Sequence, residues 1–521
     1  GKKSLIKAVA FSGKERTYQS WYGTPESVIN GNADEMNAYA DRNYLSDAER
    51  TNLLESGRTY NYYTYQDEVD NYQQDNYQLH FTHTFSPKTI LNVAGHYTKG
   101  RGYYEQYKLG QDFSEYGLAN VINGDDTLTS TDLIRRRWLD NDFVGGVYSL
   151  SHTVNSNLSF QLGGAGNTYI GAHFGELVWA RYASESEIYD RYYDNNAQKT
   201  ELSSYLKADY VKNNWSLFAD VQYRYVDYNF GGFDDVSGNL IDLDQKEVYN
   251  FINPKIGGSF AFDANNRVFL SAGIGNREPV RKDFRESSAQ SRPEHETLQD
   301  VELGHTFQSK KAQFQTNIYF MNYNNQLINT GKINDVGSYT RVNVAESYRL
   351  GIEISAVLRL LNSLDIQGGV TFSENKIASF TEYVDNYDDP NYEQTQIEHE
   401  NTNMAFSPNL IGNLGFTYRP LEGFTLNWMT KYVGDQFLDN TSSQDRKIDA
   451  FTYSNLSLNY TIEDYVFKSI TLGIQFNNIL DAKYQNNGYT WGYIAGGQRT
   501  IENFYYPQAG RNFMLRLLVN I

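Results

Sequence analysis

The sequence contains no cysteine, only 9 prolines and no long apolar run among its 521 residues. The absence of cysteine excludes disulfide bonds and thiolate metal sites. No segment approaches the roughly 18 to 20 apolar residues that a membrane-spanning helix needs. No cleavable signal sequence begins at Gly1, so we expect any export signal to have been removed or to lie outside this chain. Basic residues are few, because 45 Lys and Arg stand against 63 Asp and Glu. This acidic balance argues against nucleic acid as a partner.

The motifs of covalent chemistry are also missing. The chain has no G-x-S-x-G, no P-loop, no H-E-x-x-H and no G-x-G-x-x-G after a strand. His80 and His83 are three positions apart in a predicted strand, so they point to opposite faces and cannot share a metal ion. We therefore predict that the protein is not an enzyme and needs neither a cofactor nor a metal.

Alternating apolar and polar residues are abundant. In the last segment, Phe513, Leu515, Leu517, Val519 and Ile521 form one face of a predicted strand. We count about 18 such segments. Their polar faces carry many Asn and Gln residues, which cost free energy when buried unpaired but not when they line water. The 44 tyrosines suit the aromatic girdles of outer-membrane barrels. The pattern predicts an all-β fold, a transmembrane antiparallel β-barrel.

Short and long connections alternate along the chain, as in barrels with short periplasmic turns and long extracellular loops. The short turns lie at 86–88, 155–157, 212–214, 264–266, 309–311, 361–363 and 421–423. The long polar connections lie at 13–71, 108–133, 180–198, 231–247, 279–297, 328–338, 384–403, 439–449 and 481–506. The first strand is predicted at 4–11. An even count of about 18 strands allows a closed, porin-like barrel, and the alternative is that earlier strands and an N-terminal domain are missing.

Several motifs together resemble a known family. They are Asn253-Pro254-Lys255-Ile256-Gly257, Arg277-Glu278-Pro279, Pro293-Glu294 with Leu298, Glu302-Leu303-Gly304, Tyr339 with Asn343, Gly351-Ile352-Glu353, Asn477-Asn478-Ile479-Leu480-Asp481 with Tyr484, and Pro507 with Gly510-Arg511. In order and spacing they resemble the C-terminal barrel of a TonB-dependent outer-membrane receptor. Gly13 to Tyr18 and Tyr169 to Gly175 resemble stretches of the Bacteroidetes branch of that family.

The resemblance implies a 22-stranded barrel with an N-terminal plug, in the outer membrane of a Gram-negative bacterium. It implies active uptake of scarce ligands, powered by the TonB–ExbB–ExbD complex. The sequence departs from this pattern, because residues 1–521 read as barrel alone, with about 18 strands and no plug. Ile521 also replaces the usual terminal aromatic residue. Expected partners are outer-membrane lipid and lipopolysaccharide, TonB–ExbB–ExbD through the absent N-terminal part, a metal chelate or corrinoid, and a surface lipoprotein.

Aromatic and arginine residues are frequent in the long connections. They are Arg16, Tyr18, Trp21, Tyr22, His173, Trp179, Arg181, Tyr182, Arg277, Arg281, Trp491, Tyr493 and Arg499. A receptor for an anionic chelate or porphyrin needs aromatic surfaces and guanidinium groups, so we predict ligand binding there. For any single residue the alternative is a girdle aromatic or an ion-paired arginine. His173 is either a haem ligand or a polar rim residue.

The connection 231–247 contains Asp234, Asp235, Asp242 and Asp244. Oxygen-rich loops can bind calcium, but the EF-hand spacing is absent, so we interpret it as a solvated acidic loop. The sequence as a whole predicts an importer of an iron chelate, a siderophore or haem. The alternatives are a cobalamin or oligosaccharide importer of the same family and an 18-stranded passive porin.

Overall fold

The computed structural model describes residues 1, 3–236, 239–242, 245–285, 287, 292–333, 339–391, 393–463 and 466–521, with the side chains of 234–236 and 239–242 excepted. The chain divides into two compact units. Unit 1 comprises 1–20, 63–256 and 280–288, and unit 2 comprises 21–62, 257–279 and 289–521. Within the described residues, no helix is both long enough and apolar enough to cross a bilayer.

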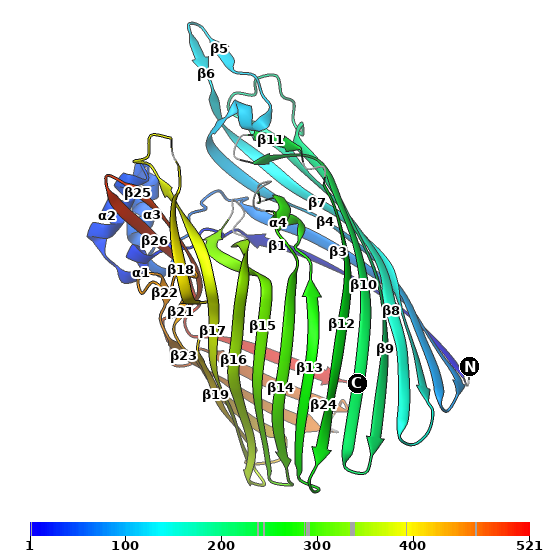
Figure 1. The fold of residues 1–521 in the computed structure, drawn as a ribbon. Coiled ribbons are helices and arrows are strands. Elements are labelled where there is room, and N and C mark those ends of the chain that lie inside the picture. Colours follow the sequence, from blue (N-terminus) through cyan, green and yellow to red (C-terminus); the bar gives the residue numbers. More distant parts are fainter. Residues whose placement is uncertain are drawn as a thin grey trace. The chain divides into compact units, whose positions relative to one another are not determined.

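Unit 1 is a sheet of eight long strands, each antiparallel to the next where its register is described (Figure 1). In sheet order they are β1 (Ser4–Tyr18), β3 (Val69–Ser86), β4 (Thr89–Asp112), β7 (Ser130–Thr153), β8 (Leu158–Ala180), β9 (Arg191–Lys212), β10 (Trp215–Val236) and β12 (Gln245–Ala261), the last belonging to this unit through Ile256. Smaller elements are η2 (Phe113–Tyr116), β5 (Val121–Asn123), β6 (Asp126–Leu128), β11 (Asn239–Asp242) and α4 (Arg281–Arg285).

Unit 2 is a sheet of ten antiparallel strands. In sheet order they are β13 (Asn266–Arg277), β14 (Glu296–Gln308), β15 (Ala312–Ile333), β16 (Tyr339–Leu361), β17 (Leu364–Asn386), β19 (Leu410–Tyr418), β20 (Phe424–Val433), β23 (Phe451–Glu463), β24 (Ser469–Asn477) and β27 (Asn512–Asn520). Shorter elements are β2 (Thr24–Pro25), α1 (Glu26–Asn30), α2 (Ala33–Arg42), α3 (Asp47–Glu55), η1 (Gly57–Thr59), β18 (Thr395–Asn403), β21 (Gln436–Phe437), β22 (Lys447–Ile448), β25 (Gln485–Ala495) and β26 (Gln498–Pro507).

The predicted all-β, antiparallel fold is confirmed, and the long strands of the two units match the predicted count of about 18. The cause is the alternation of the sequence. Leu458 on β23 pairs with Ile474 on β24, while Asn459 beside it pairs with Gly473, so one face is apolar and the other polar. Apolar side chains such as Leu472 are more than half exposed, as a lipid-facing surface requires. The seven predicted short turns all connect strands.

Glycines in the sheets make room for tyrosine rings. Gly163 on β8 pairs with Tyr205 on β9, and a Cβ at this glycine would lie 2.5 Å from the tyrosine hydroxyl. Gly351 on β16 is covered in the same way by Tyr319, its partner on β15. A tyrosine lying flat over a glycine of the next strand fixes the register and fills the gap left by the missing side chain.

The predicted long connections contain more regular structure than expected. The first strand extends from the predicted Phe11 to Tyr18, and three helices follow in place of a polar loop. Residues 231–236 continue β10, of which 233–236 pair with β11. The connection 481–506 contains nearly all of the hairpin β25–β26. The sequence does contain a signal for the start of α3, because Ser46 and Glu49 have the spacing of a capping box and form one in the structure. Paired strands and helices satisfy backbone groups that a bare loop would leave to water.

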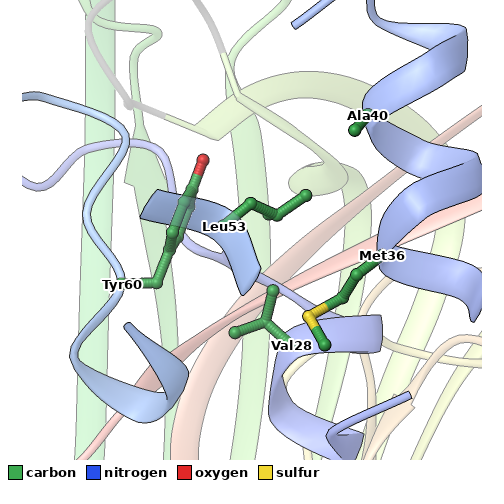
Figure 2. Packing of buried hydrophobic residues seen from close by; sticks show 5 residues of the cluster. All are labelled: Val28, Met36, Ala40, Leu53 and Tyr60. Atoms are coloured by element: carbon green, nitrogen blue, oxygen red, sulfur yellow. The ribbon is translucent and has the colours of Figure 1, made fainter. Parts of the chain in front are cut away.

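The helices α1 to α3 enclose a small core of their own. Val28, Met36, Ala40, Leu53 and Tyr60 are buried and point toward one another (Figure 2). Next to this core, β2 pairs with β26 through Thr24 and Tyr505. An ion pair of 3.0 Å joins Arg42 to Glu502, and the helices therefore lie beside the β25–β26 hairpin (Figure 1).

Candidate ligand-binding site

A cluster of polar and aromatic side chains lies on one face of unit 1. It consists of Arg137 on β7, His173 on β8, Tyr193 and Asn195 on β9, and Arg281 on α4, and we call it the His173 cluster. The strand residues have odd numbers, whereas exposed apolar residues such as Leu162 and Leu206 have even numbers. Because neighbouring residues of a strand point to opposite faces, the cluster lies on the polar face.

The short helix α4 holds Arg281 over this face. Phe284 is 2 % exposed and packs against Phe230 and Tyr228, with ring centroids at 5.3 and 6.4 Å. The backbone NH of Val280 donates to Asp283 at 2.8 Å, which fixes the start of the helix. Residues three apart lie on the same side of a helix, so burial of Phe284 turns Arg281 toward the sheet.

Hydrogen bonds connect the members of the cluster. Arg281 donates from Nη1 to His173 Nδ1 at 3.1 Å and from Nη2 to the side-chain oxygen of Asn195. Arg137 donates from Nε to the Tyr193 hydroxyl at 3.3 Å. Because a guanidinium can only donate, Nδ1 of His173 accepts and the ring proton of the neutral imidazole lies on Nε2. This tautomer leaves no free nitrogen lone pair for iron, which argues against the haem-ligand interpretation of His173.

The electrostatic field at His173 is positive. Burial, followed by the charges of Arg281, Arg137 and Arg285, lowers the pKa of His173 to about 3. The residue lies roughly 16 positions beyond the turn at Asn157, whereas the membrane span takes roughly 9 to 11 residues, so it lies beyond the bilayer. At neutral pH the histidine is therefore uncharged, and the arginines supply the charge of the cluster.

The run Arg135-Arg136-Arg137 divides between the two faces of β7. Arg135 lies on the same face as Arg137 and donates to Gln106 and to the Tyr116 hydroxyl, both at 3.1 Å. Arg136 points the other way and pairs with Glu105 at 2.7 Å. Alternation thus places two of the three guanidinium groups on the polar face.

Unit 2 contains a second arginine-rich group, which we call the Glu382 network. Arg446 bonds to Glu382 at 2.8 Å and to Asp439 at 2.6 Å, and Arg499 and His399 also bond to Glu382. Burial alone would raise the pKa of Glu382, but hydrogen bonds from Arg446, Arg499 and His399 outweigh it and lower this pKa to about 2. The network borders a cavity of about 190 Å³ that Trp491 also lines.

The remaining predicted residues of unit 1 make local contacts. Arg16 pairs with Asp67 at 2.7 Å, and both side chains are more than half exposed. The Tyr18 hydroxyl donates to the Tyr65 carbonyl at 2.6 Å. The ring of Trp179 lies 6.4 Å from the Tyr107 ring, measured between centroids. Arg181 forms an ion pair with Asp132 at 2.7 Å, and the backbone NH of Tyr182 donates to the Thr131 hydroxyl at 2.9 Å. Of the seven predicted residues in this unit, His173 and Arg281 contact each other directly.

Among the predicted residues of unit 2, the hairpin β25–β26 carries Trp491, Tyr493 and Arg499. The rings of Trp491 and Tyr493 lie 5.3 Å apart, and Arg499 joins the Glu382 network. The carbonyl of Trp21 accepts a hydrogen bond from the Tyr506 hydroxyl at 2.5 Å. The rings of Tyr22 and Tyr62 lie 5.1 Å apart between centroids, and Arg277 forms an ion pair with Glu296 at 2.9 Å.

Sequence reasoning missed Arg137, Tyr193 and Asn195 in the first cluster and Glu382 and Arg446 in the second. A signal existed for Arg137, since a triple arginine in an alternating strand must place charge on the polar face. No comparable signal exists for Glu382 and Arg446, which come together only through tertiary structure. Within the described part of the chain, no group of three or more His, Cys, Asp or Glu could hold a metal ion. The acidic side chains at 234, 235, 242 and 244 lie outside the described residues.

Three solved structures show how far the fold is shared. The ferric-catecholate import receptor Fiu from E. coli K12 in its closed form is 13% identical, with a TM-score of 0.67, covering 98% of this chain and 72% of Fiu. The unliganded ferric citrate transporter FecA is 14% identical, with a TM-score of 0.68 and coverages of 100% and 68%. The ferric yersiniabactin receptor FyuA from Yersinia pestis is 10% identical, with a TM-score of 0.66 and coverages of 98% and 67%. This chain spans about two thirds of the length of such structures.

A match to a described protein family covers most of the sequence. Residues 17–479 match the family described as "TonB dependent receptor-like, beta-barrel". This range includes most strands of both sheets, the whole His173 cluster and the Glu382 network except Arg499, and it contains most of the motifs that suggested the resemblance. The chain therefore belongs to the TonB-dependent receptor-like β-barrel family.

Proposed function

We propose that this protein captures and imports an anionic metal chelate, a ferric siderophore, across the outer membrane, energised by the TonB–ExbB–ExbD complex. Members of the family are transporters of the Gram-negative outer membrane and not enzymes. The observation that carries the choice of ligand is the His173 cluster. It combines guanidinium groups with tyrosine rings on the polar face, which is the chemistry that binds carboxylate or catecholate oxygens.

The cluster favours a siderophore over haem. In its hydrogen-bonded tautomer His173 offers no lone pair to iron. Arg281 and Arg137 donate to side chains of this face, and two guanidinium groups at one place suit the paired oxygens of a carboxylate or catecholate ligand. Cobalamin has no need of such a positive field. The names of the similar structures, which concern ferric chelates, support the same choice.

The barrel wall in this proposal needs neighbours for its two edge strands. Within unit 1, β1 pairs with β3, and within unit 2, β27 pairs with β24. An unpaired backbone group in hydrocarbon costs several kcal/mol, so a bilayer requires that the outer edge of each of these strands is paired. We propose that both edges are paired in the assembled receptor, and that a plug gates it.

Uptake by whole cells tests the proposal. Cells grown under iron limitation, with the gene intact or deleted and with TonB present or absent, are given radioactive iron as ferric citrate, a ferric catecholate or haemin, and labelled cobalamin in parallel. We expect saturable uptake of at least one ferric siderophore-type chelate that requires both the gene and TonB. Uptake of cobalamin or haemin alone, or non-saturable uptake without TonB, would show the proposal to be wrong.

A further inference from the structure

The cavity beside the Glu382 network is large enough for a small organic molecule. Its volume is about 190 Å³, and a cavity of roughly 150 Å³ holds one benzene molecule. It is lined by residues of β15, β16, β17 and β25 and by the connection 439–446. Its apolar lining residues include Val342, Phe380, Val384 and Trp491. One ring, or a short branched chain, would therefore fill most of it.

Arg446, which lines this cavity, has one edge of its guanidinium unused. The side chain is buried, and both of its hydrogen bonds leave from Nη1, to Glu382 at 2.8 Å and to Asp439 at 2.6 Å. In the part of the chain that the structure describes, Nε is buried and has no hydrogen-bond partner. No hydrogen bond of Arg446 leaves from Nη2 within the same residues. The Nε–Nη2 edge thus offers two parallel N–H donors with no acceptor.

The glycine at position 492 keeps space open beside this edge. Gly492 lines the cavity, and a Cβ there would lie 3.6 Å from Nη2 of Arg446 and 2.7 Å from the Thr500 carbonyl oxygen. On the other side of the guanidinium, Glu382 and Asp439 hold Nη1 in place. The unused donors are therefore fixed before any ligand arrives, which reduces the entropy lost on binding.

The charges around the cavity leave room for one anion. Lys332, Arg446 and Arg499 stand against Glu382 and Asp439, which gives one formal positive charge when histidine is counted as neutral. A ligand with a single negative charge would balance this group. A cation would meet a surplus of its own sign, and a dianion would leave one negative charge without a partner in a buried site.

We infer that this cavity binds a small apolar monocarboxylate, a carboxylic acid with one ring or a short branched chain. The two oxygens of a carboxylate match the parallel donors of the Nε–Nη2 edge. The apolar part of the ligand would pack against Val342, Phe380 and Trp491. This site goes beyond the chelate proposed for unit 1 and does not depend on it, because its residues all belong to unit 2.

Titration with acids and their amides tests the inference. The receptor, purified from outer membranes in an uncharged detergent, is titrated with phenylacetate, cyclohexanecarboxylate and 3-methylbutanoate by calorimetry and saturation-transfer NMR, and empty micelles give the background. Each acid is compared with its own primary amide, which has nearly the same shape and no charge. We expect saturable binding of at least one carboxylate. Its amide should bind about 10- to 100-fold more weakly, the size of one or two charge-assisted hydrogen bonds.

Two substitutions in the cavity should weaken this binding. Val342→Phe fills the space without removing a charged group and should lower the affinity at least tenfold. Arg446→Lys keeps the charge but removes the two-donor edge, and we expect a loss of about tenfold or more. Because Arg446 also holds its own loop, Val342→Phe carries the test alone if the lysine variant does not fold. A heat-modifiable band on SDS gels shows whether each variant is folded.

Matched controls come from the same strand, β16, outside the lining of the cavity. Val357 is 43 % exposed, as is Val342, and the Arg359 side chain is 56 % exposed. Val357→Phe and Arg359→Lys should therefore bind the carboxylate like the unmodified protein. No saturable binding of the three acids up to about 10 mM, a weak affinity, would overturn the inference. Equal affinity for acid and amide, or normal binding by folded Val342→Phe, would do the same.

Discussion

The His173 cluster and the Glu382 network use the same cation in opposite ways. In the first, Arg281 and Arg137 donate to an imidazole, an amide and a phenol. In the second, Arg446 and Arg499 donate to carboxylates, and Arg446 is only 4 % exposed. These contacts differ in charge, and an arginine that binds buried carboxylates contributes to the architecture of its own loop. Counting arginines in the loops therefore cannot distinguish a binding residue from a structural one.

The comparison extends to the buried carboxyl groups. Glu68, just before β3, is 2 % exposed, and its Oε2 accepts from the Tyr107 NH at 3.2 Å. Burial raises the pKa of Glu68 to about 7, only partly offset by that hydrogen bond and by Lys108 and Arg135. Glu382 is buried as well, but with two arginines and a histidine bonded to it its pKa is lowered to about 2. Direct cationic partners, more than burial, decide which carboxyl is ionised.

The largest effect should come from removing the cation of the Glu382 network. Arg446→Met leaves Asp439 buried without its partner and should destabilise the surrounding loop by about 3 to 5 kcal/mol, as for other broken buried pairs. Hydrogen exchange of the amides at 436–448 should speed up strongly. Arg446→Lys keeps the charge and should lose less. Unchanged exchange in the methionine variant would mean that the network is not a structural clamp.

The pH dependence of stability should distinguish the two buried carboxyls. The folded pKa of Glu68 lies above its unfolded value, so its contribution is fully present below about pH 4.3 and is lost as pH rises through about 7. Glu68→Gln removes this loss of stability, which is on the order of 3 kcal/mol. The variant should therefore have a higher heat-denaturation midpoint than the unmodified protein at pH 8, and the difference should be much smaller at pH 5. The stability that ionised Glu382 contributes has the opposite pH dependence. It is present above about pH 4.3 and is lost as the pH falls toward 2. Equal pH profiles for the unmodified protein and Glu68→Gln would contradict this assignment.

Removing a cation from the His173 cluster should weaken ligand binding and leave the fold intact. Arg281→Met should lower the affinity for an anionic ferric chelate about 10- to 100-fold, the size of one or two charge-assisted hydrogen bonds. Arg281→Lys should fall in between, because it keeps the charge but not the planar fork. Arg50→Met, on helix α3, is the matched control. Because the pKa of His173 is about 3, affinity should show no inflection between pH 5 and 8. Such an inflection near pH 6.5, absent in His173→Gln, would refute the neutral imidazole.

The smallest effect is expected for the exposed pair of Arg16 and Asp67. Both side chains are more than half exposed, and such pairs contribute about 0 to 1 kcal/mol. Arg16→Ala should therefore change neither the denaturation midpoint nor chelate affinity measurably. A tenfold loss of affinity would instead make Arg16 a ligand contact, as the sequence alone suggested, and would extend the binding surface along β1.

Most of the wall could be read from the sequence, because strand alternation and short turns are local properties. Ser86-Pro87-Lys88 and Leu361-Asn362-Ser363 mark turns in the chain and in the structure alike. The long connections could not be read so well. The strand extension to Tyr18 and the hairpin of 481–506 depend on pairing with distant segments, and pairing partners leave no mark on a single strand.

The sequence by itself determined the fold class, the polar and apolar faces and the family, since these follow from a period of two and from motifs a few residues long. It also singled out Arg281 and His173. Only the tertiary structure decided that these two meet, that Arg137 and Asn195 join them, and that Arg499 belongs to an ion-pair network. The reason is that a side chain's charge is written in the sequence, whereas its partners are chosen by the register of strands far apart in the chain.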